Sequence, residues 1–166
     1  MQVNRRPGPG RARLEALIEQ SKKLSLRVGF FDTSKYQDGT PVAQVAAEQE
    51  FGVPSKRIPP RPFMRPTVTA NKTKWSGLFA RGSRAAVVGT IDLRSVFEQI
   101  GGVAAGDIAQ TISKIQTPAL SPMTIRMRQQ AYASGQRRVG NLTKPLVFTG
   151  LLFNAVTHEV RDDSGQ

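Results

Sequence analysis

The sequence predicts an α+β fold, in which a small antiparallel sheet packs against one long helix. Residues 24–32 and 155–161 alternate apolar and polar side chains, as half-buried strands do. Residues 92–116 carry apolar side chains at helical spacing, in a stripe long enough to cover one face of such a sheet. The 166 residues suit one domain, which we place at residues 13–161.

The two ends of the chain are expected to lie outside this domain. Residues 1–12, with the sequence MQVNRRPGPGRA, combine proline, glycine and arginine, a composition typical of a flexible or extended basic arm. A short helix is predicted over residues 12–22, directly before the first strand. The polar residues 162–166 are expected to fray at the other end of the domain.

Helix signals divide the middle of the chain. Residues 41–51 begin with proline and are followed by Gly52, the residue type expected at a helix C-terminal cap. Another helix is predicted over residues 64–88, and Asp92 can cap the start of the long helix that follows.

The second half of the chain carries three further signals. The pair Gly101-Gly102 is expected to bend or split the long helix. Ser121, which precedes a proline, predicts the start of a second, short helix. Thr149 can cap a last turn of helix before the final strand.

The sequence contains no pattern that we associate with catalysis. The single histidine, His158, lies in the predicted last strand, where a lone histidine is usually structural. Because the chain has no cysteine, disulfides, thiolate metal sites and cysteine nucleophiles are excluded. The acidic pairs, Glu48 with Glu50 and Asp162 with Asp163, do not resemble a pair of catalytic carboxylates. We therefore expect no enzyme, no cofactor and no metal site.

An excess of basic residues gives the chain a formal charge of +12, with 24 Lys and Arg against 12 Asp and Glu. Such a charge favours contact with DNA or with an acidic protein partner. Basic side chains concentrate at Arg126, Arg128, Arg137 and Arg138. These residues form either a solvated face or a surface that contacts an acidic partner or, non-specifically, DNA phosphates. No apolar run reaches the about 20 residues of a membrane-spanning helix, so we expect no membrane contact.

Residues 50–66, EFGVPSKRIPPRPFMRP, form a proline-rich segment that we call the proline ribbon. Its prolines hold the backbone extended and remove amide donors, so it cannot be an interior strand. Two interpretations remain open. The ribbon is either a rigid connector that packs Phe63 on the core of its own subunit, or a preordered interface strap. In the strap, Phe63 and Met64 insert into a pocket while Arg61 and Arg65 point elsewhere.

Three stretches resemble tail-completion proteins of tailed bacteriophages, the minor tail protein Z-like group. VAQVAAEQEFGVPSKRIPPRPFMRPTV resembles the family's helix ending in EFG, followed by IPPRPF-RP. PALSPMTIRMR resembles its P-LSP-TI--R segment, and KPLVFTGLLFNAVTHEV resembles its closing KPL-DTG-L-NS-T-EV motif. Phe148 stands where the family commonly has Asp, and Ala155 where Ser is common. The three motif segments, in the family's order, are residues 42–68, 118–128 and 144–160.

The resemblance implies a structural virion protein that completes the tail and joins it to the head. It implies a ring of identical subunits, a hexamer, between neighbouring neck and tail-tube proteins at the head–tail junction, after assembly in the host cytoplasm. It implies no catalytic residue. The matched positions that we expect to make ring contacts are Arg61, Pro62, Phe63 and Arg65. The matched positions that we expect to be structural are Lys144, Pro145, Leu146, Thr149, Gly150 and Leu152.

Two other functions stay open from the sequence. A tail terminator, which caps growth of the tail tube, belongs to the same neighbourhood of the virion and is also a small α+β ring protein. A small basic DNA-binding protein would instead bind duplex DNA with a steep dependence on salt. The sequence has no helix-turn-helix, zinc-finger or RNA-binding motif, so any DNA contact is expected to be non-specific.

Overall fold

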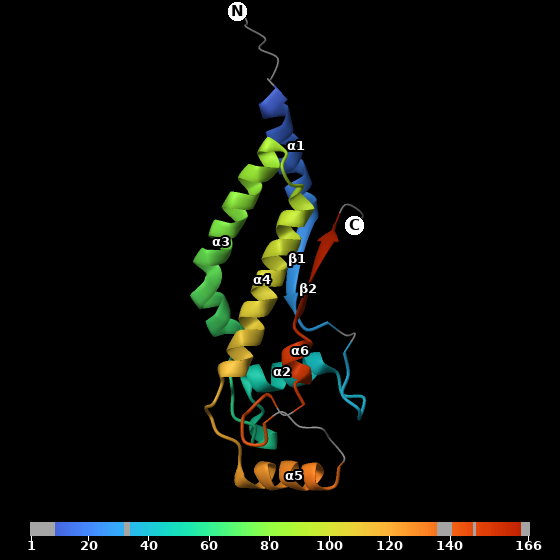
Figure 1. Ribbon diagram of the computed structural model, residues 1–166, viewed down its shortest axis with the longest axis vertical. Coiled ribbons are helices and arrows are strands. Elements are labelled where there is room, and N and C mark those ends of the chain that lie inside the picture. The colour runs from blue at the N-terminus through green and yellow to red at the C-terminus, as the bar shows by residue number, and fades with distance from the viewer. Residues whose placement is uncertain (1–8, 32–33, 136–140, 148, 164–166) are drawn as a thin grey trace, which may run out of the picture. The chain divides into compact units, whose positions relative to one another are not determined.

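A computed structural model describes residues 9–31, 34–135, 141–147 and 149–163. It combines helices with a two-stranded antiparallel sheet that packs against a long helix, so the α+β class predicted from the sequence is confirmed. The elements in chain order are α1 (Pro9–Lys23), β1 (Leu24–Gly29), α2 (Val42–Phe51), the 3-10 turn η1 (Pro54–Lys56), α3 (Met64–Val88), α4 (Leu93–Lys114), α5 (Pro122–Ala133), α6 (Leu151–Asn154) and β2 (Thr157–Asp162) (Figure 1).

The described residues form two compact units, and neither unit is continuous in sequence. The first unit takes its residues from the chain up to Val28, from Lys72–Ala104 and from His158 onward. The second unit comprises Gly29–Asn71 and Ala105–Thr157. Helices α3 and α4 each contribute residues to both units. The boundary of a single domain at residues 13–161 stays a prediction.

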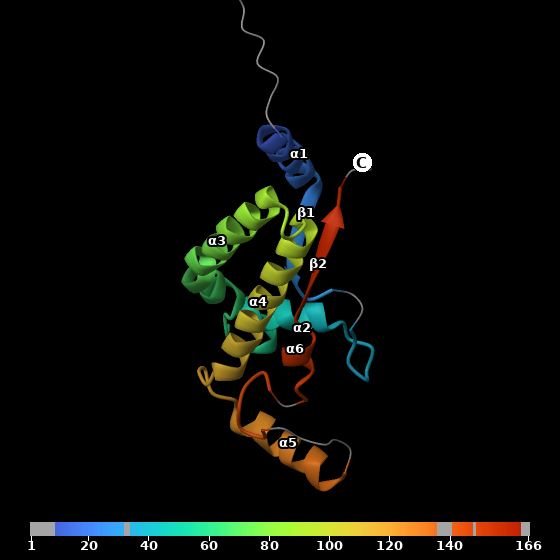
Figure 2. The same cartoon turned by 45° about the horizontal axis from the view of Figure 1, so that its top comes forward.

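The first unit holds the sheet. Strands β1 and β2 pair with each other, and α4 runs beside them in both views (Figures 1 and 2). The core of this unit is apolar, as expected for a sheet with one covered face. Its buried apolar side chains are Ala86, Leu93, Val96, Ile100, Ala104 and Val160.

The glycine pair does not split α4, which continues without interruption through Lys114 and so corrects our expectation of a split. Gly101 instead allows the sheet to lie close to α4. A Cβ atom at this position would collide with the imidazole of His158, and it would lie 2.8 Å from Leu26 Cδ1. Tight packing against two strands therefore compensates for the low helix propensity of glycine here.

The described residues near both chain ends are more ordered than we predicted. Helix α1 begins at Pro9, so residues 9–12 of the predicted flexible arm are helical. Proline is tolerated in the first turn of a helix, and Arg11 Nε lies 2.9 Å from Glu15 Oε1 one turn later. At the other end, Asp162 belongs to β2, and the Asp163 amide donates to the Lys23 carbonyl at 2.7 Å. Residues 1–8 and 164–166 lie outside the described residues.

The predicted helix caps in the middle of the chain are present. Asp92 Oδ1 accepts a hydrogen bond from the Ser95 amide at 2.9 Å, and Ser121 Oγ accepts one from the Thr124 amide at 3.1 Å. Gly52 ends α2 with a φ of 75°, and its amide donates to the Glu48 carbonyl. Two features favour glycine at this position. One is the positive φ, and the other is that a Cβ atom would lie 2.8 Å from the backbone nitrogen of Pro60.

The second unit contains α2, the proline ribbon, α6 and the last turns of α4. Helices α2 and α6 contact each other. Phe63 of the ribbon is buried, and its ring meets the ring of Phe30 edge to face, with 5.9 Å between centroids. The other buried apolar side chains of this unit are Val42, Ala46, Ala105, Ile108, Ile112 and Leu152.

Candidate functional site

Glu50, at the end of α2, fixes the end of the proline ribbon. Its side chain is only 6% exposed, and its Oε2 accepts hydrogen bonds from the amides of Phe63 at 2.6 Å and Met64 at 2.9 Å. Its Oε1 accepts bonds from the Arg65 amide at 3.2 Å and from Arg65 Nε at 2.9 Å. These amides belong to the start of α3, where helix donors lack partners within the helix. Glu50 therefore caps α3 from a different helix.

This arrangement keeps Glu50 ionised. Burial acts to raise the pKa of the carboxyl group, since it disfavours the charged form. The amide of Met64, the guanidinium of Arg65 and the amides of Phe63 and Arg65 outweigh burial, so the pKa of Glu50 lies below its ordinary value. A carboxylate held in this way also benefits from the positive end of the α3 dipole.

Arg61 joins the ribbon to the second motif segment. Its Nε donates to the Pro118 carbonyl at 2.8 Å, and its Nη2 donates to the Ala119 carbonyl at 3.1 Å. Its Nη1 donates to Gln49 Oε1 at 3.1 Å. The residue is 5% exposed, and burial lowers the pKa of its guanidinium. A guanidinium does not deprotonate in proteins, so Arg61 remains a buried cation.

Arg128 joins the second motif segment to the third. Its Nη1 donates to the Lys144 carbonyl at 2.9 Å and to the Leu142 carbonyl at 3.4 Å. Burial lowers the pKa of Arg128, and the positive charge of Arg61 lowers it further. The two guanidinium groups therefore raise the positive potential in the same place.

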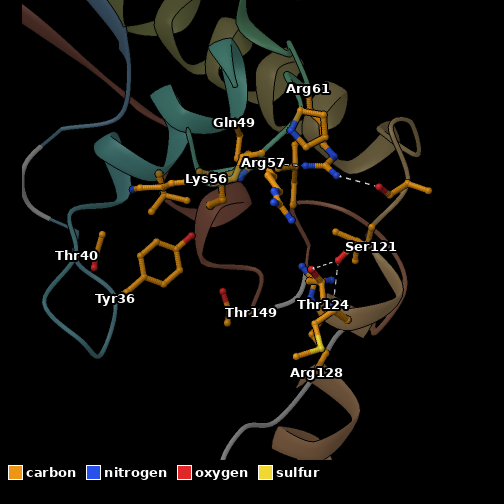
Figure 3. A pocket seen from close by; sticks show the side chains of 18 of the residues that line it. Tyr36, Thr40, Gln49, Lys56, Arg57, Arg61, Ser121, Thr124, Arg128 and Thr149 are labelled. Atoms are coloured by element: carbon orange, nitrogen blue, oxygen red, sulfur yellow. Dashed lines mark hydrogen bonds between the residues drawn. The ribbon is translucent and has the colours of Figure 1, made fainter. Parts of the chain in front are cut away.

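A pocket of about 890 Å³ lies among these residues, within the second unit. Figure 3 shows side chains of the ribbon and of the start of α5 around one space, with Arg57, Arg61 and Arg128 among them. The charged residues of the lining are Lys56, Arg57, Arg61 and Arg128 against Asp38. Its apolar residues are Val45, Ile58, Pro59, Ala119, Leu120, Met123, Leu146 and Leu152. The remaining residues are Tyr36, Thr40, Gln49, Ser121, Thr124 and Thr149.

The chemistry of the pocket suits the binding of an anion that carries apolar groups. Guanidinium groups bind carboxylates and phosphates through paired hydrogen bonds, and the apolar wall removes hydrocarbon from water. His158, the only histidine, lies in the first unit, where its Nε2 is 3.1 Å from Glu98 Oε2. We assign it a structural place beside α4.

The residues predicted to make ring contacts divide into two kinds. Pro62 and Arg65 are exposed, although Arg65 is bound to Glu50 and stacks over the ring of Phe51 at 5.1 Å. Arg61 and Phe63 are buried within their own subunit, which corrects their assignment to a contact surface. Their burial favours the connector over the strap, because a strap needs Phe63 free to leave its own core.

The closing motif contributes to the pocket, and the structural role that we expect for its residues stays a prediction. Leu152 and Pro145 are buried, and the Thr149 hydroxyl accepts a hydrogen bond from the Leu151 amide at 3.2 Å. Leu146 and Gly150 have positive φ values of 63° and 69°. Lys144 contributes its carbonyl to Arg128. Leu146, Thr149 and Leu152 line the pocket.

Of the four basic residues singled out in the second half of the chain, the structure describes Arg126 and Arg128, and their surroundings differ. Arg128 is half-buried and lines the pocket, whereas Arg126 is exposed and is not part of the lining. Arg137 and Arg138 lie outside the described residues.

Sequence reasoning missed Glu50, Lys56 and Arg57. From the sequence alone we pair Glu50 only with Glu48, although an acidic residue just before a proline-rich turn and a new helix can cap that helix. Lys56 and Arg57 precede the IPPRPF motif of the ribbon. The sequence has no periodicity there that would predict in which direction their side chains point.

Comparisons with models of protein families, with curated proteins and with solved structures find no match to this chain. In the part of the chain that the structure describes, no helix is long and apolar enough to cross a bilayer. No cluster of His, Cys, Asp and Glu that could hold a metal ion occurs among these same residues.

Proposed function

We propose that this protein is a structural component of a bacteriophage head–tail junction, which completes the tail and joins it to the head as a ring of identical subunits. One observation carries the proposal. The three motif segments, which are far apart in the sequence, meet around one pocket in the second unit. The proposal includes assembly in the host cytoplasm and a final location in the virion.

The residues that carry the resemblance are also the residues that hold the three segments together. Arg61 of the first segment binds the backbone of the second at Pro118 and Ala119. Arg128 of the second segment binds the backbone of the third at Lys144. Short matches that arose by chance would have no reason to interlock in this way. Their interlocking supports a common structural unit behind the resemblance.

Exposed apolar side chains support a role in an assembly with other proteins rather than a role as an isolated monomer. None of the residues of α5 is buried, and Met123 and Met127, one turn apart, are 65% and 60% exposed. Phe51 is 67% exposed at the end of α2. Apolar groups left in water at such positions are typical of contact surfaces. A subunit of a ring meets adjacent copies through two different patches, and it needs further surfaces for the neighbouring neck and tail-tube proteins.

Electron microscopy of a lysate, in which this gene alone is disabled in its phage, tests the proposal. We expect filled heads beside separate, unattached tails, and complementation with the wild-type gene restores joined particles. Tails of uncontrolled length would instead favour the tail-terminator alternative. Normal, infectious particles would contradict both functions.

The high positive charge favours one alternative of another class, a small DNA-binding protein. That function predicts binding of duplex DNA by the isolated subunit, with an affinity that falls steeply as salt rises.

A further inference from the structure

We infer that the pocket of the second unit binds an acidic segment of a different protein, with a carboxylate of that segment among Arg57, Arg61 and Arg128. This inference names the class of partner for the pocket, and its place in a virion rests on the proposed function. The binding itself is a property of the isolated subunit.

The first argument is the uncompensated charge of Arg61. Its hydrogen-bond partners are two backbone carbonyl groups and the amide of Gln49, all of them neutral. A buried charge is costly unless an opposite charge accompanies it. The three bonds leave part of the guanidinium's donor capacity unused, so a carboxylate in the pocket can supply both the missing charge and further acceptors.

The second argument is the position of Arg57 at the edge of the same pocket. Among the residues that the structure describes, its side chain makes no hydrogen bond or ion pair. Its backbone has a φ of 53°, a conformation that is costly for a residue with a Cβ atom. Paired hydrogen bonds between Val53 and Ile58, of 2.9 and 3.1 Å, close the turn that holds it there. The backbone of Arg57 is thus held in place at the edge of the pocket, and its exposed guanidinium is available to a ligand.

The third argument is the apolar wall beside these cations. Ile58 and Leu120 line the pocket, and Met123 extends it onto the exposed face of α5. Met127 continues that face by one turn beyond the pocket. Methionine side chains adapt to varied apolar partners. The site therefore offers a place for a carboxylate next to a surface for apolar side chains, which is the composition of an acidic and apolar peptide segment.

Charge complementarity argues against a second copy of this chain as the occupant. The chain has twice as many basic as acidic residues, so its own surface repels a positive pocket. Duplex DNA is also a poor fit, since it offers no apolar side chains and cannot enter a concave pocket of this size. Pockets of this volume are typical of small ligands and short segments.

The test measures binding of purified full-length protein to an array of short peptides built from Asp, Glu, Leu and Phe. Each peptide has a matched version with Asn and Gln in place of the acids. We expect a subset of acidic peptides to bind and their neutral versions to bind at least tenfold more weakly. The best acidic peptide is then labelled, and its dissociation constant is measured by fluorescence polarisation.

Two variants locate the site. Arg57→Gln is expected to weaken binding of the labelled peptide about tenfold, because it removes a charge-assisted hydrogen bond. Met127→Ser is expected to weaken it about threefold through loss of apolar contact. Both side chains are exposed, so the variants are expected to fold like the wild type. Arg84→Gln, which removes one exposed charge from α3 in the first unit, is the matched control and leaves the affinity unchanged.

Three results would overturn the inference: no acidic peptide binds the wild type, neutral versions bind equally well, or Arg84→Gln weakens binding as much as Arg57→Gln. The inference would also be overturned if the wild type bound a DNA duplex but no acidic peptide, and if Arg57→Gln lost the binding of the duplex. Failure of the proposed function can be told apart from failure of this inference. Normal particles without this gene would contradict the proposed function, while binding of the acidic peptide by the purified subunit would still support the inference.

Discussion

Glu50 holds the end of the proline ribbon in place. It accepts hydrogen bonds from three consecutive amides at the start of α3 and from the side chain of Arg65. A single carboxylate therefore fixes the direction in which α3 leaves the ribbon. Its ionised form is needed for this, since only a carboxylate accepts all these bonds at once.

Glu50→Gln is expected to destabilise the protein by about 2–3 kcal/mol at pH 7, because hydrogen bonds to a buried charged group are lost or weakened. The pKa of Glu50 is lowered in the folded state, so its contribution to stability is present above the ordinary glutamate pKa of about 4.3. That contribution is lost as the pH falls through the folded-state pKa. Urea denaturation of both proteins at pH 7 and at acidic pH measures the difference.

The difference in unfolding free energy between the wild type and Glu50→Gln should shrink as the pH falls. Glu48→Gln is the matched control, since Glu48 lies on the same helix and pairs with Lys56 on the surface. Its effect at pH 7 is expected to be much smaller. A difference that stayed constant with pH would show that the charge of Glu50 contributes nothing.

Phe63→Ala is expected to lower the free energy of unfolding by about 3–5 kcal/mol, because it empties a fully buried site against Phe30. Phe51→Ala, at an exposed site, is expected to cost less than about 1 kcal/mol. Chemical denaturation of the two variants checks both values. A Phe63→Ala protein with wild-type stability but no assembly into particles would restore the strap interpretation.

At the scale of elements, the two neighbouring glycines of α4 have different roles. Gly101 is buried against His158 and Leu26, whereas Gly102 is exposed and has only an ordinary contact, 3.8 Å from its built Cβ position to His158 Cε1. The sheet can lie close to α4 only along the side where Gly101 lies.

Gly101→Ala is therefore expected to destabilise the protein by about 1–3 kcal/mol through overpacking. Gly102→Ala is expected to stabilise it by about 0.5–1 kcal/mol, because alanine is the better helix former. The thermal midpoints of the two variants should move in opposite directions from the wild type. Equal shifts would show that helix propensity alone determines the stability of both variants, and that the sheet does not pack closely against α4 at Gly101.

Elements with strong local signals were predictable from the sequence. The helix predicted over residues 64–88 is found at Met64–Val88, and Ser121 caps α5 as expected. Both predicted strands are found. The first begins at residue 24 as predicted and ends three residues earlier, and the second begins two residues later and ends one residue later. These elements depend on periodicity, on turn residues and on caps, all of which are local properties of the chain.

The pocket was not predictable, because its bonds are neither local nor periodic. Arg61 reaches carbonyl groups that follow it by 57 and 58 positions. Every residue has a carbonyl group, so no side-chain pattern marks those acceptors. The burial of Arg61 also contradicts the usual exposure of arginine, and only the folded structure shows the bonds that compensate for it.

At the scale of the whole molecule, the formal charge of +12 includes many cations that have partners within the chain. Several cations pair with acids within the chain, and Arg61 and Arg128 donate to backbone carbonyl groups. Among the residues that the structure describes, the cations in ion pairs include Arg11, Lys22, Lys56, Arg65, Arg94 and Arg161. Net charge by itself therefore overstates how many cations are ready to meet phosphates along a duplex.

From this distribution we expect the isolated subunit to bind duplex DNA no more tightly than about 1 µM at physiological salt, within the range of non-specific binding. The measurement is the dissociation constant of a labelled duplex over a series of salt concentrations. Arg57→Gln and Arg84→Gln should weaken DNA binding equally, since each removes one of many dispersed charges. A loss specific to Arg57, with a steep salt dependence, would favour the DNA-binding alternative. It would also remove the reason to assign the pocket to an acidic segment, because the same guanidinium would then serve a phosphate.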